Sequence, residues 1–290
     1  MAHQSNPNKP LQTLLSLDPY LKPYEAELKR RFERFRETES RLTGGRMSIA
    51  EFASAHEYFG LHFTDNQWVF REWAPNADAI YMIGEMTGWR ESKTYAMEKD
   101  TATGIWEIRL SADQLSHGNQ YRLRIHWGGT SGDRIPAYAR RVVQDPQTLI
   151  FNAQVWFPPQ PYQWRCPDFR APGEPPLIYE AHVGMAQEEG KVGTYEEFSE
   201  KILPRIRDAG YNVIQLMAIQ EHPYYGSFGY HVSNFFAPSS RFGTPEELKK
   251  LVNRAHEMGI AVIMDIVHSH AVSGNTGQAS VAAAHIRLHI

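Results

Sequence analysis

The chain has 290 residues, of which 42% are hydrophobic and 22% are charged, and its formal net charge is −3. This composition is typical of a soluble globular protein, and the small net charge does not indicate a nucleic acid or an anionic membrane as partner. The single cysteine, Cys166, excludes an internal disulfide and favours a reducing compartment. No apolar run is long enough to span a bilayer, and the N-terminus lacks the apolar region of a signal peptide. We therefore expect a cytoplasmic protein.

The length predicts more than one folded unit, and residues 1–60 have the pattern of a helical segment. Gly44-Gly45 is expected to end one helix, and Ser48 and Glu51 form the capping box of the next. The run Lys29–Arg31 could bind phosphate, but glutamates alternate with these cations and favour a solvated helix face. The opposite, apolar face of the first helix contains Leu21, Tyr24, Leu28, Phe32 and Phe35.

Residues 61–157 change to a period of two, which predicts short strands separated by turns and therefore a β-sandwich. The expected strands are 68–73, 79–83, 104–110 and 120–127. Trp106 shares a face with apolar neighbours and is expected in the core. Trp89, beside a turn, is the candidate for an exposed sugar-stacking platform, although packing is the simpler interpretation.

Residues 158–176 are rich in proline and predict an extended linker that lies over a neighbouring surface. After it, residues 177–272 alternate apolar strands (177–184, 212–217 and 260–264) with helices that begin at capping boxes. The two boxes are Thr194–Glu197 and Thr244–Glu247. This alternation predicts a parallel sheet covered by helices, with functional groups after the carboxyl ends of the strands.

The polar residues Asp265, His268 and His270 follow the third of these strands. Without further information, Asp265 would be a turn or capping residue, and His182 a core histidine with its hydrogen bonds satisfied. His268 and His270 could form a metal pair, but no third ligand accompanies them at a usual spacing, so we expect neither a metal nor another cofactor. Tyr230, in the aromatic loop after the second strand, would ordinarily serve packing.

Four motifs in this region carry a resemblance to a known family. They are 180–185 (EAHVGM), 221–230 (EHPYYGSFGY), 239–247 (SSRFGTPEE) and 265–270 (DIVHSH). Their sequences and mutual spacing closely resemble the glycogen (1,4-α-glucan) branching enzymes of the α-amylase superfamily. The helical start and the sandwich resemble that family's N-terminal segment and starch-type carbohydrate-binding module, so the resemblance covers roughly residues 15–272.

The resemblance implies a retaining glucan transferase on a TIM (β/α)8 barrel, which cleaves an α-1,4 chain through a covalent intermediate and transfers it to a 6-hydroxyl. It implies that His270 hydrogen-bonds the sugar at the cleavage point and that Tyr230 stacks beneath that ring. Asp265 would stabilise the charge network, and His268 would shape the strand end. His231 stands where the family has Gln, which leaves its role open.

A complete barrel takes about 250 residues, whereas the pattern here predicts only about three β/α units. In the family, the reacting carboxylates follow later strands, so we assign no catalytic residue. Residues 273–290 depart from the family pattern and form an atypical tail. We expect a truncated, inactive branching-enzyme portion, whose partners are an α-1,4-glucan and the missing C-terminal part. The alternatives are a glycoside hydrolase or debranching relative and a non-catalytic glucan-binding protein.

Overall fold

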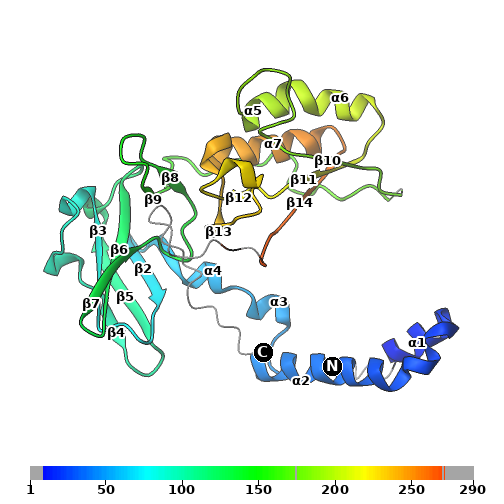
Figure 1. Cartoon of the computed structure of the whole chain (residues 1–290), viewed down its shortest axis with the longest axis horizontal. Helices are drawn as coiled ribbons and strands as arrows, with labels where there is room; N and C mark the ends of the chain where they lie inside the picture. The colour runs from blue at the N-terminus through cyan, green and yellow to red at the C-terminus, as the bar shows by residue number, and fades with distance from the viewer. Residues whose placement is uncertain (1–8, 174, 270, 272–290) are drawn as a thin grey trace. The chain divides into compact units, whose positions relative to one another are not determined.

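The computed structural model describes residues 9–173, 175–269 and 271 (Figure 1). The chain forms two compact units, the first ending at Tyr58 and the second beginning at Phe59. His270 and the tail 273–290 lie outside the described residues. In the described part, no helix is both long and apolar enough to cross a membrane.

The first unit is helical, as predicted. Its longest helix ends at Gly44, whose φ of 63° is the left-handed conformation that glycine adopts without strain, and Ser48 and Glu51 form the predicted capping box. On its apolar face, Tyr24 and Phe35 are exposed, whereas Leu21, Leu28 and Phe32 are partly buried. The helices are α1 (Lys9–Leu17), a 3-10 turn (Pro19–Tyr24), α2 (Glu25–Thr43), α3 (Ile49–Phe52) and α4 (Ala55–Tyr58).

The second unit begins with two antiparallel sheets that pack face to face. One has the order β1-β2-β5-β4, and the other has the order β3-β6-β9-β8, with β7 paired to β6. Trp106 is 4% exposed in the core between them, and its Nε1 donates to the Ala74 carbonyl at 2.9 Å, which confirms its predicted place. The strands are β1 (Gly60–Thr64), β2 (Gln67–Trp73), β3 (Ala79–Gly84), β4 (Glu98–Asp100), β5 (Ile105–Ser111), β6 (Gln120–Trp127), β7 (Thr130–Arg134), β8 (Val142–Gln144) and β9 (Phe151–Gln154).

The chain then forms a parallel sheet of order β10-β11-β14, as predicted. Helices α6 and α7 cover one face of it (Figure 1). Among the described residues, β14 pairs with β11 alone, and Met264 on it is 51% exposed. The elements are β10 (Ile178–Ala181), α5 (Tyr195–Glu197), a π-helix (Phe198–Ile202), α6 (Leu203–Asp208), β11 (Val213–Leu216), β12 (Gln220–Glu221), β13 (Asn234–Pro238), α7 (Pro245–Glu257) and β14 (Ala261–Met264).

Two features of this region differ from the sequence prediction. The helix that begins at Thr194 is not continuous, because a π-helical turn interrupts it before Pro204. The aromatic loop contains the antiparallel pair β12–β13, which the pattern did not indicate. The remaining short 3-10 turns are Glu85–Thr87, Lys93–Tyr95, Ala112–Gln114, Tyr225–Ser227 and Ser240–Phe242.

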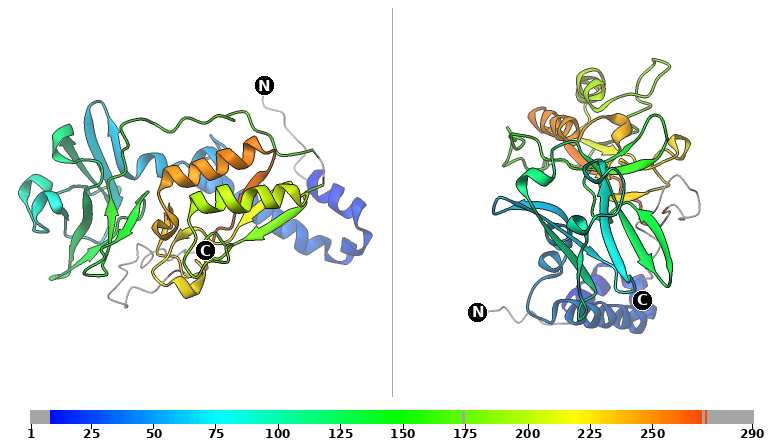
Figure 2. Two further views of the ribbon diagram at one scale, coloured as in Figure 1. Left: turned by 90° about the horizontal axis from the view of Figure 1, so that it is seen from above. Right: turned by 90° about the vertical axis from the view of Figure 1, so that its left-hand side faces the viewer.

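The proline-rich segment runs along α7 (Figure 2). Just before this segment, Trp156 donates to Glu246 near the start of the helix. Further on, the Arg165 amide donates to Asn253 at 2.8 Å, and Phe169 stacks on His256 with ring centroids 3.9 Å apart. These contacts hold the segment on the helix at several points.

The sandwich and the parallel sheet region share an interface that the sequence did not predict. The Arg141 guanidinium donates to the Gly243 carbonyl and lies over the Trp156 ring. Tyr138 stacks on Phe236 of β13 with centroids 4.5 Å apart, and the neighbouring Ala237 belongs to the sandwich core. The two regions therefore pack as one body.

Candidate functional site

The carboxyl ends of β11 and β14 bring two distant loops together. The Asp265 amide donates to the Leu216 carbonyl at 2.9 Å, which extends the β11–β14 pairing by one residue. The Val267 amide donates to Oε1 of Gln220 at 3.0 Å, and Nε2 of Gln220 donates to the Phe235 carbonyl at 3.0 Å. Gln220, which is 8% exposed, therefore joins the segment after β14 to β13.

Tyr230 and Asp265 are in direct contact at this edge. The Tyr230 hydroxyl donates to Oδ2 of Asp265 at 2.9 Å. Partial burial and the neighbouring carboxylate raise the pKa of the Tyr230 hydroxyl, so it remains a proton donor. The described residues provide no cation in an ion pair with Asp265. The tyrosine is its hydrogen-bond partner.

The approach of Tyr230 to this edge requires a glycine. Gly229 has a φ of 91°, and a Cβ atom there would lie 1.8 Å from the Ala218 carbonyl oxygen. The chain before Tyr230 can therefore pack against the chain after β11 only if residue 229 has no side chain. This explains the glycine in the sequence Phe228-Gly229-Tyr230.

His268 lies beside the same cluster but contacts a different ring. Its imidazole stacks on Phe235 with centroids 5.8 Å apart and an interplanar angle of 11°. Val267, the preceding residue, is 7% exposed and packs with Ala218 and Val232. Because Val267 anchors the segment, His268 and Asp265 are both held at the strand ends. His270 lies outside the described residues.

Behind this edge, the aromatic loop after β11 contains buried polar groups. Glu221 is 1% exposed and accepts hydrogen bonds from the amides of His222 and Ser240 at 3.1 and 2.7 Å. Burial raises the pKa of its carboxyl group.

His182 lies in the core as predicted, but neither ring nitrogen has a hydrogen-bond partner among the described residues, so the expectation of satisfied bonds was wrong. Burial lowers its pKa, which favours the neutral imidazole.

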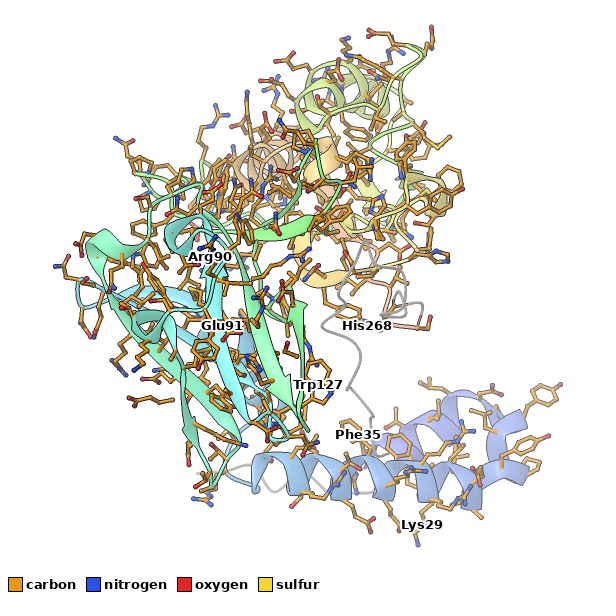
Figure 3. The ribbon with its side chains drawn as sticks, turned by 60° about the vertical axis from the view of Figure 1, so that its left-hand side comes forward. Lys29, Phe35, Arg90, Glu91, Trp127 and His268 are labelled. Carbon is orange, nitrogen blue, oxygen red and sulfur yellow. The ribbon has the colours of Figure 1, made fainter. Side chains whose placement is uncertain are left out.

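Trp89 lies in the sandwich, in the turn after β3, and is 37% exposed. Its φ of 61° is unusual for a residue other than glycine, and its amide donates to the Gly84 carbonyl at 2.9 Å. The loop that follows is held against β6, because Glu91 lies 2.8 Å from Nε2 of His126 (Figure 3). Trp127, at the end of β6, is also exposed, with Arg134 over its ring.

The sequence assigned Tyr230, Asp265, His268 and His270 to one site, and the structure gathers the first three at one edge of the sheet, whereas His270 lies outside the described residues. Sequence reasoning missed Gln220 and Phe235, which hold this edge together. The only signal for Gln220 was a polar residue at the end of the apolar run that continues past β11. In the described ranges, no group of three or more His, Cys, Asp or Glu side chains could hold a metal ion.

Residues 58–139 match the family "Carbohydrate-binding module 48 (Isoamylase N-terminal domain)", and residues 181–282 match "Alpha amylase, catalytic domain". The chain is 44% identical over 267 residues to a 1,4-alpha-glucan-branching enzyme of Rhizophagus irregularis, covering 89% of this chain and 38% of that protein. It is 40% identical over 272 residues to the enzyme of the same name from Felis catus, covering 90% of this chain and 38% of that one. The relative from Solanum tuberosum is 42% identical over 274 residues, or 91% and 31% of the two chains.

Among solved structures, a pullulanase from Bacillus acidopullulyticus superposes with a TM-score of 0.62 at 21% identity, covering 77% of this chain and 31% of that one. The catalytic module of the pneumococcal protein SpuA superposes with a TM-score of 0.56 at 21% identity, covering 72% and 37%. Identities this low support the fold alone.

The predicted order of helical segment, sandwich and partial barrel is confirmed. The chain spans only 31% to 38% of the length of the three relatives named above.

Proposed function

We propose that this chain, which belongs to the 1,4-alpha-glucan-branching enzymes and corresponds to their N-terminal part, binds an α-1,4-glucan and positions it for branching. One observation carries the proposal: the similarity covers 89% of the chain, and the two family matches, residues 58–139 and 181–282, include the sandwich and the strand ends, where Tyr230 and Asp265 form a hydrogen bond. A sugar-binding module and a sugar-positioning edge are thus parts of one packed body.

The roles proposed for the residues at the strand ends are those that the family resemblance implies. Tyr230 would present its ring to the sugar at the cleavage point while its hydroxyl holds Asp265. His268, stacked on Phe235, would keep the strand end in shape, and His270 would bond sugar hydroxyls. Trp89 would offer a second, separate stacking surface on the sandwich.

The reaction itself requires two further groups. A retaining transfer needs a carboxylate nucleophile and a second carboxyl group as acid and base, about 5 Å apart. By the family resemblance, these follow later strands than the three of the sheet described above. We therefore expect these 290 residues to bind glucan without turning it over.

The experiment is a titration of the 290-residue chain with glycogen, measured by co-sedimentation. Trp89→Ala and Tyr230→Ala should each weaken binding several-fold, because loss of an aromatic contact costs roughly 1 kcal/mol. Tyr20→Ala is the matched control, since this tyrosine is 89% exposed and lies in the helical unit. Equal binding by all variants would contradict the proposal.

A non-catalytic glucan-binding protein is the second candidate, favoured by the match of residues 58–139 to a carbohydrate-binding family. It predicts that Trp89→Ala abolishes binding and that Tyr230→Ala has no effect. A hydrolase or debranching relative is the third. An α-1,4 hydrolase would release reducing ends from amylose and a debranching enzyme would release them from the α-1,6 branches of amylopectin, whereas a branching enzyme changes the iodine stain without releasing them.

We also propose a cytoplasmic location, supported by the single cysteine. The relative from Oryza sativa carries the description chloroplastic/amyloplastic, so cell fractionation with an antibody against the chain is the appropriate test. Recovery in an organelle fraction would contradict this location.

A further inference from the structure

Pro204 reshapes the helix that begins at Thr194. Proline has no backbone N–H, and its ring collides with the carbonyl group four residues earlier, so a regular α-helix cannot continue through it. Instead, Phe198–Ile202 form a π-helical turn, in which the Leu203 amide bonds to the Phe198 carbonyl. Such wide turns are rare and are frequently found at functional sites.

A cavity of about 340 Å³ opens beside this turn. Its walls come from three segments that are distant in the sequence: the π-helical turn, helix α7 and the proline-rich segment that runs along α7 (Figure 2). This volume is within the range of small-ligand pockets. The lining residues are Arg165, Ser199, Glu200, Pro204, Lys250 and Arg254.

The proline-rich segment is fixed at this cavity by a buried side chain. Asn253 is 0% exposed, and its Oδ1 accepts the Arg165 amide hydrogen at 2.8 Å. Nδ2 of Asn253 donates to Glu257, which also accepts from Arg165 Nε at 2.8 Å. Arg165 is therefore held over the cavity from both its backbone and its side chain. Ser199, 5% exposed, adds a hydroxyl group to the lining.

The lining offers several cationic hydrogen-bond donors. Arg165, Lys250 and Arg254 outnumber the single carboxylate, Glu200. Each cation already has an acidic partner, since Glu257 bonds both arginines and Glu196 bonds Lys250 at 2.8 Å. The Lys250–Glu196 pair is half exposed and therefore weak, whereas Glu257, which both arginines share, is only 19% exposed. A guanidinium group has five N–H donors, so both arginines keep donors for a further oxyanion.

We propose that this cavity binds a phosphate group, either as free inorganic phosphate or on a small phosphate ester. Arginine and lysine side chains recognise phosphate through charge-assisted hydrogen bonds, and the cavity has room for a phosphate with an attached group of sugar size. The site lies on the helix side of the sheet, away from Tyr230 and Asp265, and its test does not depend on glucan binding.

The experiment is isothermal titration calorimetry of the 290-residue chain with inorganic phosphate and, separately, with glucose 6-phosphate, at constant ionic strength in chloride. Lys250→Met combined with Arg254→Met should weaken binding roughly tenfold or more. Glu200→Gln removes the opposing charge and should strengthen it roughly threefold. Lys249→Met is the matched control, because Lys249 lies beside Lys250 but bonds Glu246 instead.

The variants alter exposed side chains, and thermal melting checks that they fold. Tighter binding of glucose 6-phosphate than of phosphate would identify an ester as the ligand, and equal affinities would identify the phosphate group alone. Both results support the site if the Lys250, Arg254 and Glu200 variants shift affinity in the stated directions. Absence of binding to both probes, or equal effects of Lys249→Met, would overturn the proposal.

Discussion

Tyr230 and Asp265 are 35 residues apart in sequence, yet the tyrosine hydroxyl lies 2.9 Å from the aspartate Oδ2. The bond connects the aromatic loop after β11 to the segment after β14, and it exists because Gly229 lets the loop pack against the Ala218 carbonyl. Two side chains that the sequence predicted to belong to one site are thereby fixed to each other without any ligand.

Loss of this bond should have a measurable effect on stability. Tyr230→Phe keeps the ring but leaves the half-buried Asp265 carboxylate without its donor, so the free energy of unfolding should fall by about 1 to 2 kcal/mol. Urea unfolding followed by circular dichroism measures this change. Tyr224→Phe is the control, because Tyr224 is 64% exposed and should tolerate the change. Equal midpoints for the two variants would argue against a structural role for the bond.

Gln220 should control the order of the segment that carries Asp265 and His268. Gln220→Ala removes the acceptor of the Val267 amide and the donor to the Phe235 carbonyl, and both groups are then left unpaired. We expect a loss of about 2 to 3 kcal/mol and faster hydrogen exchange at the Val267 amide. Gln215→Ala, on β11, provides the comparison. Unchanged exchange at Val267 would show that Gln220 does not hold this segment.

Glu72 makes the sandwich sensitive to pH. It is 8% exposed in the core, and its carboxylate accepts a hydrogen bond from the Ala137 amide at 3.1 Å. Desolvation by burial raises its pKa to about 7. The charged and titratable groups around it are Arg134, Tyr121 and Tyr138, and the positive charge of Arg134 opposes the rise.

The Glu72 carboxyl binds its proton more tightly in the folded state than in the unfolded state, where its pKa is about 4.5. Its contribution to the free energy of unfolding is therefore fully present below pH 4.5 and is lost as the pH rises towards 7. The contribution lost over this pH range is about 3 kcal/mol. Glu72→Gln should abolish this contribution and raise the melting temperature at pH 8. Thermal melts between pH 5 and 8 measure it. Parallel pH profiles for wild type and variant would contradict the assignment.

Arg141 should couple the sandwich to the parallel sheet region. It is 8% exposed, donates to the Gly243 carbonyl and lies over Trp156, and burial lowers the pKa of its guanidinium group. Arg141→Met should cost about 2 to 4 kcal/mol and separate the unfolding of the two regions in calorimetry. Arg140→Met, at an exposed arginine that bonds His62 instead, should keep a single transition. A single transition for Arg141→Met as well would mean that other contacts join the two regions.

Local signals in the sequence predicted most of the fold. The capping boxes at Ser48, Thr194 and Thr244 are all present, because each depends on a bond between residues three apart. The π-helical turn before Pro204 was missed, although proline marks the place, because the pattern of apolar residues continues through it. The pairing of β12 with β13 was missed because the strands are short.

The site was predictable to the level of the strand ends and no further. Alternation of strands and helices places Asp265 and His268 at the carboxyl edge of the sheet, and the motifs added Tyr230. Which side chains touch depends on contacts across the fold, such as Gln220 to Val267 and Arg141 to Gly243, and no periodicity encodes these. The same holds for the cavity beside Ser199, which requires three separate segments.

The most direct test of the central claim combines binding and turnover in one sample. The 290-residue chain is incubated with amylose, pelleted with the insoluble glucan, and assayed for iodine absorbance and reducing ends. We predict that the protein sediments with the glucan while both readouts stay at the level of the blank. Branching or hydrolysis by this chain, or failure to sediment, would contradict the account.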